Sequence, residues 1–322
     1  MEKWLQAKKK HHYVWEYYLK KWAINGEVYW ITPKGKIAHD STKGMCRIQE
    51  LYKINTLNSQ DIEFIKAHIR PLSHDLQQII LKRLTESIEA TNIINRLIRL
   101  EESGHGVKNE KESLLFNLLE DYYSNIELGA RPAIDGLAND APKILEVQQN
   151  LICLYSYIGH QITRTQGFKQ RVFQSFEEEK HPTHSSKQFY RNLTEKNWWF
   201  ISSYIFGYNM GYSLYKDRSK EPLIILKNTT TIPFITSDIP VINIYPDNFD
   251  LTNIPEFMDA YFPLSPQRAL LISASDKWRF LEKGLSNDNV SMLNEKIARR
   301  AHSSIYGSSE ESIKNYKHLL GT

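Results

Sequence analysis

Cysteine is scarce in this 322-residue sequence, which contains Cys46 and Cys153 and no other. Two cysteines so far apart make neither a disulfide framework nor a zinc-binding pattern, and this usage is typical of proteins in a reducing cytoplasm. No stretch approaches the roughly 18 apolar residues of a membrane helix. The opening MEKWLQAKKKHH has no apolar segment after its charges, which a secretory signal would need. We therefore expect a cytoplasmic protein without a membrane partner.

The motifs of several large enzyme classes are also missing. There is no glycine-rich phosphate loop ending in Gly-Lys-Ser/Thr, and the Gly104-His105-Gly106 step lacks the third glycine of a dinucleotide fingerprint. The zinc-protease and nucleophile-elbow signatures do not occur either. His181 and His184 lie close together, but no third ligand accompanies them. The sequence thus predicts no particular cofactor, and a divalent metal stays open without a motif to support it.

What the sequence does contain is enough apolar material for a core. Hydrophobic residues make up 41% of the chain, and there are 18 tyrosines and 7 tryptophans. This composition excludes a disordered protein, and the aromatic side chains combine a large apolar area with polar groups suited to stacking surfaces. The formal net charge of +4 permits a polyanionic partner without requiring one.

The first part of the chain combines a helical pattern with strand patterns. Apolar and aromatic residues recur at helical spacing from Trp15 to Trp22 and predict a short amphipathic helix over 12–22. The Asn25-Gly26 turn signal follows, and the segments after it alternate as strands do. We therefore expect a small β-meander that ends near residue 55.

The rest of the chain is first helical and then rich in strands. Residues 59–220 predict a helical block, interrupted at Pro71 and at the Gly104-His105-Gly106 step. Short strands joined by Pro, Asn and Asp turns follow, with a last helix from about Asn289. β-segments at both ends of a helical middle predict an α+β fold, a single composite domain over 1–322 in which the two β regions share one sheet or pack together. Its sub-parts are 1–58, 59–220 and 221–322.

Two polar stretches on predicted helices are candidates for a functional site. The first contains His12, whose imidazole could act as a general acid or base near neutral pH, although a histidine beside lysines is more often surface decoration. In the second, Gln161, Arg164 and Thr165 lie within one helical turn and share a face. These side chains could clamp a phosphate or carboxylate; alternatively, Arg164 satisfies a buried Asp or a loop carbonyl.

Two further candidates lie in the C-terminal part. In TIPFITSDIPVINIYP at 231–246, Ser237 and Asp238 interrupt apolar runs. This step can be a structural turn, because Thr, Ser and Asp bond to their local backbone and Pro240 rigidifies the backbone after it. It can also be a site, with Asp238 at the mouth of a pocket as a base, a metal ligand or a partner for the arginine above. Asn294 lies on a helix face with small residues, where its amide could bridge to this turn.

These stretches, in this order, resemble a bacterial and fungal family called domain of unknown function 4238. The matching pieces are HYVWEYYLKKW, QITRT, ITSDIPV, YFPLSPQRALLIS and LNEKIARRAHSSIY, which extend from about residue 12 to 306. The sequence departs from the family pattern at Trp15, Ile239 and Gln166, where Pro, Asn and Pro are common. The resemblance therefore extends over nearly the whole chain, and it brings no established reaction with it.

The resemblance implies that polar residues from three separate regions act together. We expect the turn at 236–240 to face the helix over 161–165, with His12 near both, so that the Ser-Asp step lines a shared cleft. In that arrangement the catalytic candidates are His12, Asp238 and Ser237, and the substrate-binding candidates are Gln161, Arg164, Thr165 and Asn294.

Two functions from different classes remain open. In the first, the chain is an intracellular effector enzyme of the toxin or phage-defence type, which acts on nucleic acid or another phosphate-containing substrate; the lysines at 8–10 would suit a nucleic acid. The link to toxins and phage defence is an analogy. In the second, the chain is a non-catalytic binding or sensor module for nucleic acid or for a protein encoded nearby. The same polar cluster is then a structural hydrogen-bond network.

Overall fold

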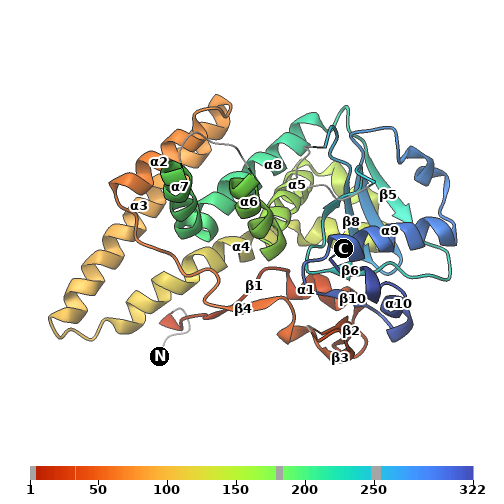
Figure 1. Cartoon of the computed structure of the whole chain (residues 1–322), viewed down its shortest axis with the longest axis horizontal. Coiled ribbons are helices and arrows are strands. Elements are labelled where there is room, and N and C mark those ends of the chain that lie inside the picture. Colours follow the sequence, from red (N-terminus) through yellow and green to blue (C-terminus); the bar gives the residue numbers. More distant parts are fainter. Residues whose placement is uncertain (1–4, 33, 179–183, 248–254, 322) are drawn as a thin grey trace.

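The computed structural model describes residues 5–32, 34–178, 184–247 and 255–321, and over these ranges the fold is α+β as expected. The longest helices extend to one side of the molecule, while strands from both ends of the chain gather at the other side (Figure 1). A helical block lies between them in the sequence and packs against the strands.

The N-terminal part contains short strands around a single helical turn. The prediction of a helix over 12–22 is wrong at its start, because His12 is paired with Arg47 in a two-stranded ladder and Trp15 keeps an extended backbone with ψ of 123°. The elements are β1 (Lys10–His12), α1 (Glu16–Leu19), a 3₁₀ turn (Lys20–Trp22), β2 (Glu27–Ile31), β3 (Ile37–Ser41), a second 3₁₀ turn (Thr42–Gly44) and β4 (Arg47–Gln49).

The predicted β-meander is wrong in its connectivity. β2 and β3 form an antiparallel hairpin, but β4 turns away from β3 and pairs with β1. The Asn25-Gly26 turn is present: both residues have positive φ, and Ile24 and Glu27 bridge across them. A continuous meander would have left β1 without a partner, whereas the observed pairing fixes the backbone on both sides of His12.

The helical block begins at α2 and ends at α8, with the interruptions that the sequence predicted. A hairpin of two long helices, α3 and α4, forms its outer part (Figure 1). The elements are α2 (Ser59–Ile69), α3 (His74–Glu102), α4 (Lys108–Ala138), a 3₁₀ turn (Pro142–Glu146), α5 (Gln148–Thr163), α6 (Gln166–Glu178), α7 (His184–Asn197), a π-helical turn (Trp198–Ser202) and α8 (Ser203–Asp217).

Helices α5 and α8 approach each other closely because glycines lie at their crossing. A Cβ atom on Gly159 would lie 2.3 Å from the carbonyl oxygen of Gly207, and one on Gly211 would lie 2.7 Å from the carbonyl oxygen of Tyr155. Both distances are shorter than van der Waals contact, so the crossing requires residues without a side chain. This crossing fixes the position of α5, whose last residue, Thr163, is followed directly by Arg164.

Strands from both ends of the chain share a sheet, which is one of the two arrangements expected from the sequence. In this sheet the order is β3-β2-β10-β6, so the N-terminal hairpin pairs with C-terminal β10; a second sheet has the order β5-β9-β8-β7. The C-terminal elements are β5 (Leu223–Lys227), β6 (Thr236–Ser237), β7 (Ile242–Asn243), β8 (Ala260–Ser265), β9 (Arg268–Ile272), a 3₁₀ turn (Arg279–Lys283), α9 (Asn287–Arg300), β10 (Ile305–Gly307), α10 (Glu310–Lys314) and a 3₁₀ turn (Lys317–Leu319).

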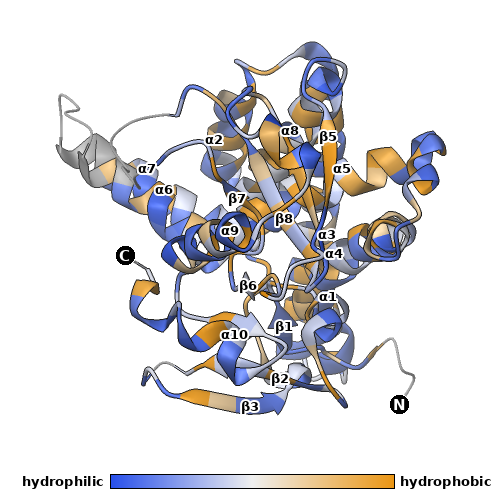
Figure 2. Cartoon of the chain, turned by 90° about the vertical axis from the view of Figure 1, so that its right-hand side faces the viewer, coloured by the Kyte–Doolittle hydropathy of each residue, from blue (hydrophilic) through white to orange (hydrophobic). Residues whose placement is uncertain are grey.

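The core lies between the second sheet and the helices. All six residues of β8 are buried, and Figure 2 shows hydrophobic residues along this strand and on the helices around it, with hydrophilic residues along α6. Among the helices of the described ranges, none combines the length and the apolar character that crossing a membrane would demand.

Candidate functional site

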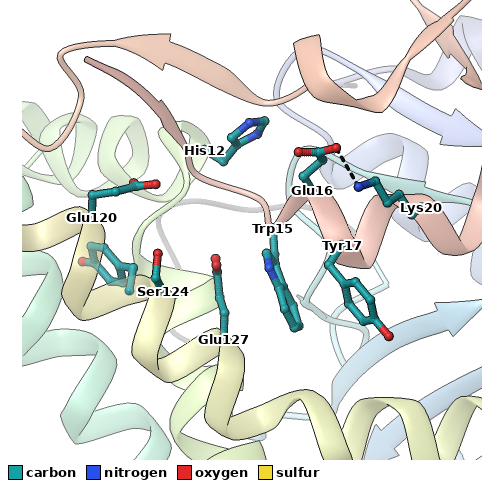
Figure 3. A pocket seen from close by; sticks show the side chains of 9 residues that line it. His12, Trp15, Glu16, Tyr17, Lys20, Glu120, Ser124 and Glu127 are labelled. Carbon is teal, nitrogen blue, oxygen red and sulfur yellow. Dashed lines mark ion pairs between the residues drawn. The ribbon is translucent and has the colours of Figure 1, made fainter. Parts of the chain in front are cut away.

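A pocket of about 270 Å³ opens where the end of β1 and helix α1 face helix α4. In Figure 3 the side chains from the N-terminal segment lie above and to the right of the pocket, and those from α4 lie below and to the left. The lining residues are His12, Trp15, Glu16, Tyr17 and Lys20 on the first wall and Glu120, Tyr123, Ser124 and Glu127 on the second.

His12 lines this pocket, and one of its ring nitrogens is held by the backbone. Its Nδ1 lies 3.1 Å from the carbonyl oxygen of Met45, which can only accept, so Nδ1 carries the proton of the neutral ring and donates it. Burial lowers the pKa of His12 below its ordinary value, and Glu16 opposes that shift. The ring is therefore neutral at physiological pH and offers Nε2 as a proton acceptor.

The neighbouring His11 has a different role. It is fully buried; its Nδ1 accepts from the backbone N–H of Tyr52 at 2.9 Å, and its Nε2 donates to the carbonyl oxygen of Phe116 at 3.1 Å. Both ring nitrogens are thus engaged with the backbone. Of the two adjacent histidines, only His12 lines the pocket.

The opposite wall consists of one face of α4. Glu120, Ser124 and Glu127 are spaced i, i+4 and i+7, which places them in a row along the helix. Burial raises the pKa of Glu120 to about 7; the nearby Glu127 adds to this shift and Arg164 opposes it. The Glu120 carboxyl can therefore hold or release a proton at neutral pH, as a general acid requires.

Arg164 lies behind this wall. The side chain is 2% exposed; its Nη2 donates to Oε1 of Glu127 at 2.6 Å and to Oε1 of Gln161 at 2.6 Å. The guanidinium also lies over the ring of Tyr123, 5.2 Å from the ring centre. The sequence left Arg164 either as a clamp for a ligand or as the partner of a buried Asp or a loop carbonyl. In the structure its partner is a buried carboxylate of the protein, which belongs to a Glu instead of an Asp.

Gln161 and Thr165, on either side of Arg164, also bond within the protein. The amide Nε2 of Gln161 donates to the carbonyl oxygen of Tyr13 at 3.0 Å. The hydroxyl of Thr165 donates to the carbonyl of Ile162 at 3.0 Å and accepts from the backbone N–H of Phe168 at 3.3 Å, where α6 begins. Gln161 thus reaches the residue next to His12, whereas Thr165 connects two helices.

Ser237 and Asp238 lie in a separate buried cluster. The carboxylate of Asp238 accepts from the backbone N–H of His302 at 2.9 Å and from the N–H and hydroxyl of Ser303 at 2.8 and 2.6 Å. Burial raises the pKa of Asp238, and these three donors oppose the shift. Ser237 donates its hydroxyl to the carbonyl of Ile239 at 2.8 Å. These bonds tie the turn after β6 to the chain that enters β10.

Asn294 also has backbone partners. Its Oδ1 accepts from the N–H of Ile235 at 3.0 Å, and its Nδ2 donates to the carbonyl oxygen of Pro233 at 2.9 Å. The predicted bridge from α9 therefore reaches the segment just before the Ser-Asp turn.

The structure thus brings together His12, Gln161 and Arg164 but not the whole predicted set. The turn at 236–240 contacts the start of α6, just after the predicted segment 161–165, since a Cβ on Gly167 would lie 2.3 Å from Cδ1 of Ile239. However, Ser237 and Asp238 are buried and do not line the pocket beside His12. Figure 3 shows that the acidic side chains opposite His12 come from α4 instead.

Sequence reasoning missed the contribution of α4. The polar residues Glu120, Ser124 and Glu127 repeat along a helix whose neighbouring positions Leu119, Tyr123 and Ala130 are buried. Such a polar row beside a buried face is the signal that would have indicated a pocket wall. Within the described residues there is no group of three or more His, Cys, Asp or Glu side chains able to hold a metal ion. The pair His181 and His184 lies outside the residues whose side chains are described.

Comparison with known proteins identifies one family. The sequence model of the family described as "Protein of unknown function (DUF4238)" matches residues 10–311, which include every part of the pocket and of the buried Ser-Asp cluster. Neither a curated protein nor a solved structure matches the chain.

Proposed function

The chain belongs to the DUF4238 family, and for this member we propose an enzyme that performs general acid–base chemistry on a small phosphate-containing ligand of the nucleotide class. One observation carries the proposal: an imidazole whose Nδ1 is held by a carbonyl oxygen and a carboxyl with a pKa of about 7 line opposite walls of one pocket. Groups that titrate near the working pH are the most effective proton donors and acceptors.

The two groups suit complementary steps of a hydrolysis. Nε2 of His12 would take a proton from the attacking water, whose oxygen bonds to the ligand atom held between the walls, and as the bond from that atom to the leaving group breaks, the protonated carboxyl of Glu120 would give the leaving group a proton. Ser124 lies on α4 one turn after Glu120 and offers a hydroxyl for orienting the ligand.

The lining of the pocket favours a ligand with an aromatic ring and an outer phosphate. Trp15 and Tyr17, with ring centres 4.8 Å apart, provide apolar faces for a base or sugar ring. The α4 wall offers a phosphate no exposed positive charge, because Arg164 lies behind it and is paired with Glu127, whereas the ammonium group of Lys20 lies on the exposed side of the pocket. A nucleotide fits this polarity with its ring inside and its phosphate near Lys20, which is also 3.0 Å from Glu16.

The N-terminal lysines give less support to a long nucleic acid. Lys8 forms an ion pair of 2.5 Å with Asp121, and Lys9 forms one of 2.8 Å with Glu112. Their charges are therefore partly neutralised by α4, which reduces the attraction of this segment for a polyanion. We accordingly favour a mononucleotide or dinucleotide over a polymer as the substrate of an effector of the toxin or phage-defence type.

A binding module is the second candidate function. The observation in its favour is that Arg164 and Asp238, two of the charged residues expected to act on a ligand, are buried and bonded within the protein. The pocket would then hold the nucleotide without converting it.

Turnover by matched glutamate variants tests the proposal. The wild-type protein, Glu120→Gln and Glu112→Gln would be incubated with mononucleotides, dinucleotides and short oligonucleotides, and the products separated by chromatography. Glu112 is a control on the same helix that does not line the pocket. We expect Glu120→Gln to lose at least about 100-fold in kcat, as removal of a general acid does, and Glu112→Gln to match the wild type. Equal turnover by all three proteins would exclude Glu120 as the acid, and binding without turnover would favour the module.

A further inference from the structure

A chain of hydrogen bonds connects the two walls of the pocket behind its surface. It begins at the carbonyl oxygen of Tyr13, the residue after His12, which accepts from Nε2 of Gln161 at 3.0 Å. The Oε1 of Gln161 accepts from Nε and Nη2 of Arg164 at 3.2 and 2.6 Å. The same Nη2 donates to Oε1 of Glu127 at 2.6 Å. One end of the chain is therefore attached to the His12 wall and the other to the α4 wall.

Every side chain in this connection is buried. Gln161 is 0% exposed, Arg164 is 2% exposed and Glu127 is 8% exposed. In such surroundings a hydrogen bond is strong and an unpaired partner is costly, so the chain favours one arrangement of its members. Gln161 lies on α5 and Arg164 directly follows it, and the position of α5 is fixed by the glycine crossing with α8.

We propose that Gln161 and Arg164 are positioning residues that hold His12 and the Glu120 face of α4 at a fixed separation across the pocket. This inference rests on the proposed function of the pocket. Neither residue lines the pocket, so both act through others: Gln161 through the backbone of Tyr13, and Arg164 through Glu127. The guanidinium binds Gln161 through Nε and Nη2 together and Glu127 through the same Nη2, and the ammonium group of a lysine does not reproduce this planar set of donors.

The proposal predicts effects that cross from one wall to the other. Gln161 has bonds to Tyr13 and Arg164, yet its loss should disturb Glu120 on α4. Arg164 bonds to Gln161 and Glu127, yet its replacement by lysine, which keeps the charge, should disturb His12. The uncharged Gln161 gives the sharper test, because the charge of Arg164 also acts directly on both His12 and Glu120; a Gln161 that only stabilised its own surroundings would disturb the nearer wall alone.

Nuclear magnetic resonance can follow each wall without any substrate. The ¹⁵N signals of the His12 ring report which nitrogen carries the proton, and the ¹³C signal of the Glu120 carboxyl reports its titration. The two signals would be assigned by their loss in His12→Gln and Glu120→Gln. The test variants are Gln161→Met and Arg164→Lys, and the matched controls are Gln170→Met and Arg96→Lys, whose side chains are exposed on α6 and α3.

We expect each test variant to change both signals and each control to change neither. Gln161→Met should shift the Glu120 titration by about half a pH unit or more, and Arg164→Lys should convert the single protonated nitrogen of His12 into a mixture. If Gln161→Met fails to fold, Gln161→Asn keeps the amide on a side chain shorter by one carbon and serves the same comparison. Changes confined to the nearer wall would overturn the proposal.

Steady-state kinetics then separates this inference from the proposed function. With a substrate in hand, both test variants should lose about tenfold or more in kcat with KM within about twofold, because misplacement of reacting groups affects the chemical step. If the variants change the signals of both walls but the protein converts no nucleotide, the proposed enzymatic function is wrong and the proposed positioning role of Gln161 and Arg164 stands. If turnover requires Glu120 but is unchanged in Gln161→Met and Arg164→Lys, the positioning role is wrong and the proposed enzymatic function stands.

Discussion

Arg164 donates to Glu127 over 2.6 Å at the end of a helix that the sequence marks by its Gln-x-x-Arg-Thr motif. The guanidinium lies beneath the pocket wall and neutralises a carboxylate that would otherwise be buried without a partner. An arginine that could have been a substrate clamp thus shapes the electrostatics of the pocket from behind. The charge of Glu120, two turns earlier on α4, depends on this pair.

Replacement of Glu127 should lower the pKa of Glu120. Glu127→Gln removes the carboxylate that raises the pKa of Glu120 and leaves Arg164 free to attract the Glu120 charge, so both effects have the same sign. We expect the Glu120 carboxyl to titrate clearly below 7 in this variant. A ¹³C titration of both proteins measures the shift, and an unchanged or raised value would contradict the account.

The titration of Glu120 should also make stability depend on pH. Because the folded-state pKa of about 7 lies above the ordinary glutamate value of 4.5, the folded protein binds the proton more tightly than the unfolded chain does. Stability should therefore fall as the pH rises from about 4.5 to 7 and change little from this source above 7. The effect is at most about 3 to 4 kcal/mol, since the pKa rises from 4.5 to about 7 and one pKa unit corresponds to about 1.36 kcal/mol.

Glu120→Gln isolates this contribution. Denaturant unfolding at several pH values should show the variant gaining stability relative to the wild type between pH 5 and pH 7.5. The same difference at all pH values would show that burial of Glu120 does not shift its titration. Glu112→Gln again supplies the control, because Glu112 lies on α4 outside the pocket.

Asp238 and His12 should respond differently to removal. Asp238→Ala leaves two backbone N–H groups and a hydroxyl of a buried turn without their acceptor, which we expect to destabilise the fold by about 3 kcal/mol. His12→Ala removes a single bond to Met45 at a half-buried site and should lower the melting temperature by no more than a few degrees.

Thermal melting and a host-cell phenotype measure this difference together. Toxicity or phage protection on expression in bacteria should be lost in His12→Ala although the protein stays folded, and lost in Asp238→Ala only with the fold. If Asp238→Ala stays stable and still loses the phenotype, Asp238 has a functional role and not only a structural one.

The glycine crossing that fixes α5 can be tested by a single methyl group. Gly159→Ala would place its Cβ 2.3 Å from the carbonyl oxygen of Gly207, so α5 and α8 would have to separate. We expect a loss of about 2 kcal/mol or more in unfolding free energy, as overpacking of a tight core produces. Gly106→Ala, where no atom lies within 4 Å, is the control. Equal stability of the two variants would show that the crossing is not tight.

The sequence predicted the order of the elements better than their local boundaries. The spacing of apolar residues and the turn residues located the helical block and its interruption at Pro71, and the shared sheet is one of the two arrangements expected for the β regions. The start of the first helix was missed because the pairing of His12 with Arg47 is a long-range contact, and such contacts override a helical pattern of only a few residues.

The candidate residues chosen from the sequence have different places in the structure. His12, Gln161 and Arg164 were singled out by their residue types; His12 lines the pocket, and the other two lie buried behind it. Glu127, the ion-pair partner of Arg164, was not chosen as a candidate, because the residue spacing on α4 does not show which arginine its carboxylate binds. Asp238 illustrates the opposite case: the same Ser-Asp letters suit a pocket or a turn, and only the backbone donors of His302 and Ser303 distinguish them.

The pH dependence of kcat/KM tests the central claim most directly. Catalysis should need neutral His12 and protonated Glu120, so activity should rise with pH through the lowered pKa of His12 and fall again near pH 7 as Glu120 ionises. In Glu120→Gln the fall near pH 7 should disappear along with most of the rate. A wild-type profile without that fall, or a variant that keeps it, would show that the pocket beside His12 does not perform the proposed acid–base chemistry.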